Sequence, residues 1–398
     1  MSAASLPAKP LSLMLVCGEP SGDQLGGELM AALKTLTPDV VFSGVGGDSM
    51  TAQGLKTLFP LDDTAVMGLA EVVPKIPVIL RRVREAAQFA LETRPDAVVL
   101  IDSPDFTHRI ARRLKRLDPA MRTVNYVAPQ VWASRSYRAR AMARYFDLVL
   151  ALLPFEPEFF EAYGLRTIFV GHPVIERQAR MKGGAALRAR LGIAADAPLL
   201  AVLPGSRTNE VRLLLPVFRA AVARLAKDVP GLVCILPLVA HVAARAREGA
   251  AGWSVPLHFV ESDADKFAAF DAADAALAAS GTVTTELALS KTPTVVGYKL
   301  GWLTYKLMRP MIHAPYATLV NIILGREAMP EFIQEDCTPE NLAAALSQLF
   351  RDEEVRSSQL RDLEEAVKRL GAGGRPPSLR AAAELLAFAR EGHTKAEA

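Results

Sequence analysis

Short apolar runs alternate with longer amphipathic segments along almost the whole chain. Strand-length apolar runs separated by helical patterns are typical of βαβ units, whose strands pair in parallel. The pattern therefore predicts an α/β protein with parallel sheets and helices between the strands. The predicted strands are 11–16, 40–44, 97–101, 123–127, 148–153 and 167–170, followed by 199–203, 232–236, 257–260, 273–278 and 294–298.

The length of the chain and a polar stretch near its middle predict two such sheets. The 398 residues are too many for one ordinary core, and the sequence turns polar after 171–173 before a second series of apolar runs begins. We expect a Rossmann-like doubly wound domain over 1–172 and a second over 173–340, facing each other across a cleft. Helices over 341–398 are expected to pack back on the first domain or on a partner subunit, which would make a homodimer. Ligands of such sheets bind beyond the carboxyl ends of the strands.

Composition excludes several classes of protein. With 51% hydrophobic and 22% charged residues the chain is globular rather than disordered, and a net charge of +3 is too small to indicate a nucleic-acid-binding protein. Cys17, Cys234 and Cys337 are far apart and the six histidines are scattered, so neither a disulfide framework nor a metal site is predicted. No apolar run is long enough to span a membrane, and the run that ends at Cys17 is interpreted as a buried strand.

One candidate for binding a diphosphate is the turn Gly205-Ser206-Arg207 after the strand 199–203. Bare amides at a helix N-terminus attract anions, and an arginine guanidinium matches phosphate oxygens. Arg207 is therefore the predicted diphosphate contact. The alternative interpretation is an ordinary strand-to-helix turn capped by Asn209, with Arg207 on the surface.

A second candidate turn, Ser280-Gly281-Thr282, follows the strand 273–278 and places Glu286 in the opening turns of the next helix. A carboxylate there can accept hydrogen bonds from ribose hydroxyls, or it can merely complement the helix dipole. Both turns fall in the second half, so a nucleotide is expected there. Neither turn has the dinucleotide or the Walker A pattern.

Carboxylates also follow strands in the first half. Asp102 comes directly after the strand 97–101 and before Ser103-Pro104, and it is the candidate general base; the alternative is a carboxylate satisfied by backbone amides. Asp105 is predicted to cap the next helix. Glu19, in the turn after the first strand, would bind a substrate hydroxyl or shape the turn.

The segment from Val66 to Leu80 is apolar and is followed by arginines. Its residues Val66, Met67, Leu69 and Val72 are interpreted either as ordinary core or as a patch that dips into a membrane interface.

Seven motifs, in order, resemble those of the lipid-A-disaccharide synthase family, over about residues 11 to 350. The resemblance implies a GT-B glycosyltransferase with an acceptor-binding first domain, a UDP-binding second domain, no metal and no other cofactor. The motifs are Gly18 to Asp23, Met67 to Val72, Asp102 to Phe106, Pro129 to Ala133, Leu153 to Glu156, Leu203 to Arg207 and Ser280 to Thr282.

The implied reaction joins UDP-2,3-diacylglucosamine to the 6-hydroxyl of 2,3-diacylglucosamine 1-phosphate (lipid X). It would invert the anomeric centre, giving the β-1,6-linked lipid A disaccharide 1-phosphate and UDP. The expected place is the cytoplasmic face of the inner membrane of a Gram-negative bacterium, with the two lipid substrates and the membrane surface as partners and no nucleic acid.

By motif, Asp102 stands where the family has its base, and Glu19 where it has a residue important for activity. The residues expected to contact UDP are Gly205, Ser206, Arg207, Ser280, Gly281, Thr282, Glu286 and Asn321.

At three positions the chain departs from the family pattern: Asp48 and Val320 stand where proline is expected, and Ser134 where an aromatic residue is expected. Two other functions fit the same architecture. One is a UDP-sugar 2-epimerase, and the other is a non-catalytic nucleotide-binding protein that would tolerate loss of Asp102.

Overall fold

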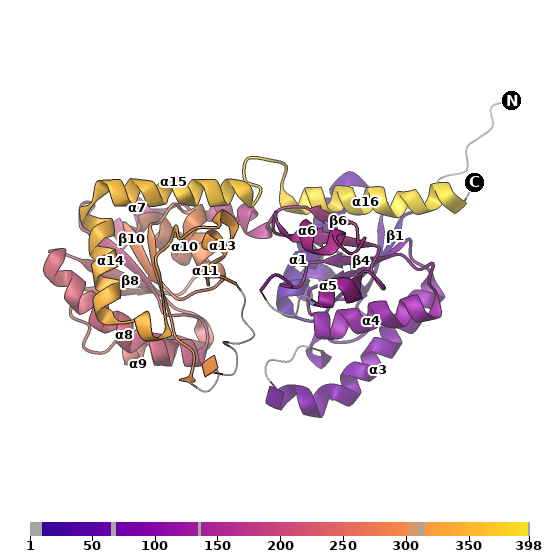
Figure 1. The fold of residues 1–398 in the computed structure, drawn as a ribbon, viewed down its shortest axis with the longest axis horizontal. Coiled ribbons are helices and arrows are strands. Elements are labelled where there is room, and N and C mark those ends of the chain that lie inside the picture. Colours follow the sequence, from indigo (N-terminus) through magenta and orange to yellow (C-terminus); the bar gives the residue numbers. More distant parts are fainter. Residues whose placement is uncertain are drawn as a thin grey trace. The chain divides into compact units, whose positions relative to one another are not determined.

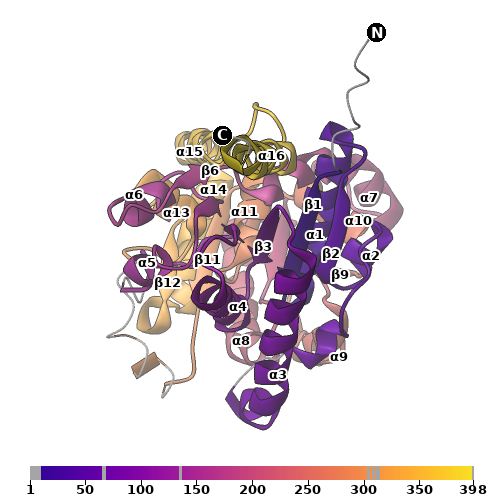
Figure 2. The same ribbon diagram turned by 90° about the vertical axis from the view of Figure 1, so that its right-hand side faces the viewer.

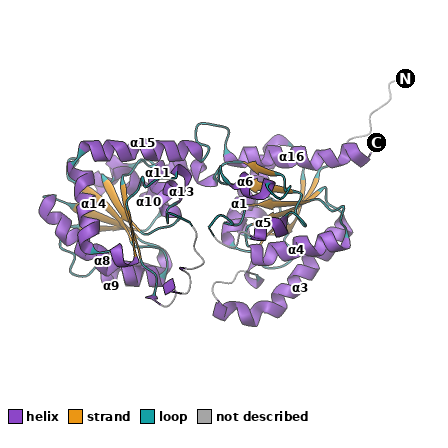
Figure 3. Ribbon diagram, in the orientation of Figure 1, coloured by secondary structure: helices purple, strands orange, loops and turns teal. Residues whose placement is uncertain are grey.

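The computed structural model describes residues 10–64, 69–133, 137–302, 305–306, 309 and 314–396. The chain divides into two compact units, one made of 1–173 with 374–398 and the other of 174–373. Each unit contains a six-stranded sheet in which the neighbouring strands run parallel (Figures 1 and 3). The prediction of two doubly wound α/β sheets is therefore confirmed.

The first unit has the strand order β2-β1-β3-β4-β5-β6. Leu13 and Leu15 of its first strand face one hydrophobic cluster, whereas Met14 and Val16 face another on the opposite side of the sheet. Successive side chains of a strand point to opposite faces, so a sheet covered on both sides needs unbroken apolar strands. Its elements are β1 (Ser12–Cys17), α1 (Pro20–Leu36), β2 (Val41–Val45), α2 (Asp48–Ala52), α3 (Leu69–Thr93), β3 (Ala97–Ile101), α4 (Pro104–Leu117), β4 (Thr123–Tyr126), α5 (Tyr137–Met142), β5 (Leu148–Ala151), α6 (Glu156–Glu161), β6 (Thr167–Phe169) and α16 (Pro377–Ala396).

The last helix, α16, completes the first unit although it follows the whole of the second in sequence. Leu385 and Phe388 are buried in the same cluster as Leu13 and Leu29, and α16 packs along α1 (Figure 1). Arg380 of α16 also donates a hydrogen bond to the Phe169 carbonyl at 2.8 Å. The first core thus depends on residues from both ends of the chain.

The second unit has the strand order β12-β11-β10-β7-β8-β9. Its elements are α7 (Gly184–Leu191), β7 (Leu199–Leu203), α8 (Thr208–Asp228), β8 (Val233–Pro237), α9 (Ala243–Gly249), β9 (Leu257–Val260), α10 (Asp263–Ala272), β10 (Ala275–Ala278), α11 (Thr282–Leu289), β11 (Thr294–Tyr298), α13 (Leu319–Leu324), β12 (Glu331–Ile333), α14 (Pro339–Arg351) and α15 (Glu353–Arg369), preceded by the 3-10 segment η2 (Pro173–Arg180).

The structure differs from the sequence expectations in two details of this organisation. The helices after residue 340 do not act as one group, because α14 and α15 belong to the second unit and α16 to the first. The strand β12 was not predicted, since it has only three residues and begins with a glutamate. Within the described residues, no helix is long and apolar enough to cross a membrane.

Candidate active site

Glu19 and Asp102 lie at the same edge of the first sheet. Their strands β1 and β3 are neighbours, with Cys17 opposite Ile101, so the chain leaves both strands at one level. The hydroxyl of Ser21 lies 3.4 Å from Oδ2 of Asp102. The order of the strands thus brings together two predicted acceptor-side carboxylates that are distant in sequence.

The backbone around Asp102 is unusual. Asp102 and Ser103 have φ of 50° and 44°, a left-handed conformation that non-glycine residues rarely adopt in succession. The peptide is held by hydrogen bonds from the Asp102 N–H to the Tyr126 carbonyl (3.0 Å) and from the Thr107 hydroxyl to the Asp102 carbonyl (2.6 Å). Such strain costs on the order of 1 to 3 kcal/mol per residue and is concentrated at functional sites.

The prediction that Asp105 caps α4 is wrong. Ser103 is the N-cap and Pro104 the first helical residue, a position that suits proline because no N–H is needed there. Asp105 is exposed in the first turn and lies 3.5 Å from Arg138. Among the described residues, no backbone amide donates to the Asp102 carboxylate, so the alternative interpretation of Asp102 is not supported.

Glu19 is half-buried at the start of α1. Burial raises the pKa of its carboxyl group, and the nearby charge of Asp102 raises it further. The carboxyl group of Glu19 therefore binds its proton more tightly than that of an exposed glutamate does.

Asp23, in the first motif, has a structural role that the sequence analysis missed. Its buried carboxylate accepts hydrogen bonds from the backbone N–H groups of Gly47 (2.7 Å), Ser49 (2.9 Å) and Met50 (3.0 Å), where α2 begins. Asp48, which departs from the family pattern, is the first residue of α2. A negative charge at this position interacts favourably with the helix dipole.

Glu156 connects two further motifs. It is 2% exposed and accepts hydrogen bonds from the N–H groups of Leu152 (3.1 Å) and Leu153 (3.0 Å) and, at 3.4 Å, from the indole of Trp132. These bonds turn the chain away from β5, which is why that strand ends at Ala151 instead of Leu153. Burial raises the pKa of Glu156 to about 7.

In the second unit, the turn at Gly205 differs from the expectation of bare amides. Glu210 Oε2 accepts hydrogen bonds from the N–H groups of Ser206 (3.1 Å) and Arg207 (3.2 Å), so these amides are already used. Gly205 has φ of 105°, and a Cβ there would lie 2.5 Å from Glu210.

Arg207, not Asn209, is the N-cap of α8. Its side chain is 76% exposed and pairs with Glu210 at 3.0 Å, so its guanidinium remains accessible to a ligand.

The turn at Gly281 is open. Gly281 and Thr282 are exposed, and among the described residues no side chain caps this end of α11. The strands β7 and β10 are neighbours, with Leu203 opposite Ala278, so the turns at Gly205 and Gly281 lie at the same sheet edge. The structure thus brings together the two turns that the sequence analysis selected for a diphosphate.

Glu286 is buried on α11 between two cations. Its carboxylate lies 2.7 Å from Arg177 Nη1 and 3.3 Å from Lys266 Nζ. Neither cation was predicted from the sequence. Glu286 therefore does more than interact favourably with the dipole of α11, because it also forms ion pairs with two side chains from other elements.

Asn321 has no exposed surface. Its side-chain oxygen accepts hydrogen bonds from the N–H groups of Ala328 and Met329, and its amide nitrogen donates to the Met329 carbonyl and to Glu331, all at 2.8 Å. The expected direct contact of Asn321 with UDP is not available here, since these partners occupy the side-chain amide. Val320 is likewise buried in the core.

The patch predicted around Val66 lies mostly outside the described side chains. Val66 and Met67 are outside the described residues, as is Ser134, and Leu69 and Val72 belong to α3 by their backbone only. Farther along α3, Ile76 and Leu80 are 44% and 37% exposed.

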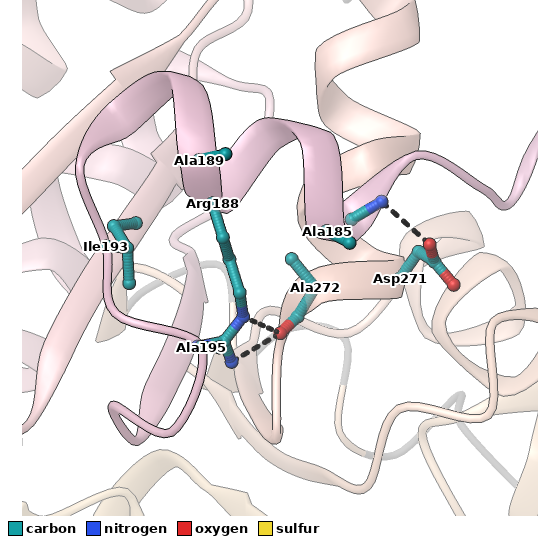
Figure 4. Close-up of a pocket in the computed structure, with 8 residues that line it drawn as sticks. Ala185, Arg188, Ala189, Ile193, Ala195, Asp271 and Ala272 are labelled. Carbon is teal, nitrogen blue, oxygen red and sulfur yellow. Dashed lines mark hydrogen bonds between the residues drawn. The ribbon is translucent and has the colours of Figure 1, made fainter.

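A cavity of about 400 Å³ between α7 and α10 is a scaffold feature (Figure 4). The Arg188 guanidinium donates to the Ala272 carbonyl at 2.7 Å, and Asp271 accepts from the Gly184 N–H at 2.8 Å. The polar groups that line the cavity therefore form hydrogen bonds within the protein that stabilise the fold.

In the part of the chain that the structure describes, no group of three or more acidic, histidine or cysteine residues could hold a metal ion.

Solved structures with the same architecture define the class of protein. A putative UDP-N-acetylglucosamine 2-epimerase from Listeria monocytogenes aligns over 97% of both chains with a TM-score of 0.63 and 14% identity. A UDP-GlcNAc 2-epimerase from Neisseria meningitidis bound to UDP-GlcNAc covers 95% of this chain and 98% of its own, with a TM-score of 0.57 and 10% identity. The chain therefore has the GT-B fold of glycosyltransferases and UDP-sugar epimerases.

Sequence relatives identify the family within that class. The family model for lipid-A-disaccharide synthetase matches residues 13–377. The lipid-A-disaccharide synthase of Rhodospirillum centenum is 48% identical over 95% of this chain and 94% of the relative, and that of Paramagnetospirillum magneticum is 46% identical over 96% and 98%. The chain belongs to the lipid-A-disaccharide synthase family and is a UDP-sugar-dependent glycosyltransferase of lipid A biosynthesis.

Proposed function

We propose that this glycosyltransferase transfers 2,3-diacylglucosamine from its UDP derivative to the 6-hydroxyl of lipid X, with inversion at the anomeric carbon. The observation that carries the proposal is the position of Asp102, whose carboxylate projects from a strained strand end and has no backbone donor among the described residues. A carboxylate at the ligand-binding edge of a doubly wound sheet, without a backbone donor among the described residues, is suited to accept a proton.

In the proposed mechanism Asp102 takes the proton of the acceptor 6-hydroxyl. The freed oxygen attacks the anomeric carbon from the side opposite UDP, the new C–O bond forms, and the bond to the diphosphate breaks with its electron pair leaving on UDP. Glu19, which lies at the same sheet edge as Asp102, forms a hydrogen bond with a hydroxyl of the acceptor sugar. In this proposal Asp102 is the base and Glu19 is a binding residue.

The binding site for the UDP-sugar donor is proposed to lie at the edge of the second sheet, at the turns after β7 and β10. The exposed guanidinium of Arg207 and N–H groups at the open Gly281 turn bind the diphosphate and stabilise the charge that develops as UDP leaves. Glu286, paired with Arg177 and Lys266, accepts hydrogen bonds from the ribose hydroxyls.

We further propose that the enzyme acts at the cytoplasmic face of the inner membrane, because both substrates carry acyl chains. Removing such chains from a bilayer costs about 0.8 kcal/mol for each buried methylene. Exposed Ile76 and Leu80 on α3, with the exposed Arg81 and Arg84 beside them, support a peripheral contact with anionic lipid.

A turnover assay tests the proposed reaction. The protein is incubated with UDP-2,3-diacylglucosamine, with and without lipid X, and UDP release is measured together with the identity of the sugar products. We expect UDP release and disaccharide formation only when lipid X is present. A donor epimerised at C2 without lipid X would indicate an epimerase instead, and UDP-sugar binding without any turnover would indicate a nucleotide-binding protein.

A further inference from the structure

We infer that Glu331 is a positioning residue that holds the Gly281 turn in the geometry that binds the diphosphate. The inference rests on the proposed role of this turn in binding UDP. Glu331 lies on β12, two strands away from β10, whose end leads into the turn. It belongs to none of the motifs that the sequence analysis selected.

The Glu331 carboxylate gathers several donors from one short segment. Oε2 accepts from the Ala317 N–H at 2.7 Å, and Oε1 accepts from the N–H of Thr318 at 2.7 Å and from its hydroxyl at 2.6 Å. Oε1 also accepts from the Asn321 amide at 2.8 Å. Hydrogen bonds to a carboxylate are short and stronger than those between neutral groups, so the segment 317–321 is fixed to the first residue of β12.

Ala317 connects Glu331 to the proposed diphosphate turn through two hydrogen bonds. While its N–H donates to Glu331, its carbonyl accepts a hydrogen bond from the Ser280 hydroxyl at 2.8 Å. Ser280 directly precedes Gly281, so the hydroxyl anchors the start of the turn. The same bond uses the only proton of that hydroxyl, and Ser280 therefore cannot donate to a phosphate oxygen while it is in place.

The network also gives Asn321 a function without a nucleotide contact. Its amide links Glu331 to the backbone of Ala328 and Met329, which closes the loop between α13 and β12. A chain of hydrogen bonds thus runs from Asn321 to Glu331, from Glu331 to Ala317, and from Ala317 to Ser280. Thr318 and Asn321 have no exposed surface, Glu331 and Ser280 are half-buried, and Ala317 is exposed.

A double-mutant cycle on UDP affinity, measured by calorimetry, tests the inference. Glu331→Gln and Ser280→Ala should each weaken UDP binding about tenfold, within the range typical of positioning residues. Because both changes break one connection, the double variant should bind UDP no more weakly than the weaker single variant. Glu331→Asp, which keeps the charge, should retain more affinity than Glu331→Gln, and lipid X binding should be unchanged in every variant.

The matched control is Asp271→Asn, which alters a carboxylate that accepts a backbone N–H elsewhere in the same unit. It should leave UDP affinity unchanged. Unchanged UDP affinity in folded Glu331→Gln, or in Ser280→Ala if the glutamine variant does not fold, would overturn the inference, as would additive effects in the cycle. Failure of the wild-type protein to bind UDP would instead refute the proposed donor site.

Discussion

Carboxylates that accept backbone N–H groups recur in this chain, at Asp23, Glu156, Glu210 and Glu331. Each holds a turn at a strand end or a helix start near the predicted ligand edges. An acidic residue in a motif is therefore not by itself evidence of contact with a substrate. Asp102 differs from these residues, since no described backbone amide donates to it.

Glu156 gives the first prediction, a pH dependence of stability. Its pKa is raised to about 7 in the folded protein from an ordinary value of 4.5, so the folded state holds this proton more tightly than the unfolded state. The stabilisation is fully present below about pH 4.5 and is lost as the pH rises through about 7. In urea unfolding, the stability of wild type relative to Glu156→Gln should fall by about 3 kcal/mol between pH 4.5 and pH 8. A difference that does not change with pH would contradict this account.

The second prediction concerns UDP affinity. Arg207→Ala should weaken UDP binding about 10-fold to 100-fold, because a charge-assisted hydrogen bond contributes roughly 1.5 to 3 kcal/mol. Glu286→Gln, which avoids leaving a cavity between Arg177 and Lys266, should weaken binding of UDP more than that of inorganic diphosphate. Arg212→Ala, an exposed arginine farther along α8, serves as the control. Equal UDP affinity in all four proteins would place the nucleotide elsewhere.

At the scale of elements, the sequence predicted the strands well because buried parallel strands are continuous apolar runs. It predicted the ends less well. The run 148–153 is apolar to its last residue, yet the Glu156 carboxylate captures the N–H groups of Leu152 and Leu153 and ends the strand early. The occupation of the amides in the Gly205 turn was also not predictable from the sequence, since only the fold shows that Glu210 bends back onto the turn.

The helix α3 carries the third prediction. It runs beside α4 (Figure 2), and its exposed Ile76 and Leu80 contradict the core interpretation for this part of the segment. Replacing both by serine should lower co-sedimentation with anionic vesicles about tenfold or more, given roughly 1.5 to 3 kcal/mol for each buried side chain. The melting temperature should change little.

Val355→Ser, an exposed valine on α15, should leave vesicle binding intact. A large fall in melting temperature for the Ile76 and Leu80 variant, or unchanged vesicle binding, would contradict the proposed membrane contact.

At the scale of the whole molecule, α16 joins the end of the chain to its beginning. Sequence analysis expected C-terminal helices on the first domain or on a partner, but it could not separate α16 from α14 and α15, because all three have similar amphipathic patterns. The fourth prediction follows from the packing. Leu385→Ala should destabilise the first unit by about 2 to 5 kcal/mol, since the side chain is fully buried.

Hydrogen exchange checks this prediction. Leu385→Ala should accelerate exchange in β1 and α1 and leave β7 and β10 protected, whereas Leu363→Ala, equally buried on α15, should do the reverse. Faster exchange of β7 and β10 in Leu385→Ala would contradict the division into two units.

Asp102 is proposed to be the base of an inverting transfer to lipid X. The most direct test measures disaccharide formation, the anomeric configuration of the product by NMR, and UDP affinity for wild type, Asp102→Asn and the neighbouring control Asp105→Asn. Wild type and the Asp105 variant should give the β-linked product, while Asp102→Asn should lose about 100-fold to 10,000-fold in turnover with unchanged UDP affinity. Turnover of Asp102→Asn within a few-fold of wild type, or an α-linked product, would contradict the claim.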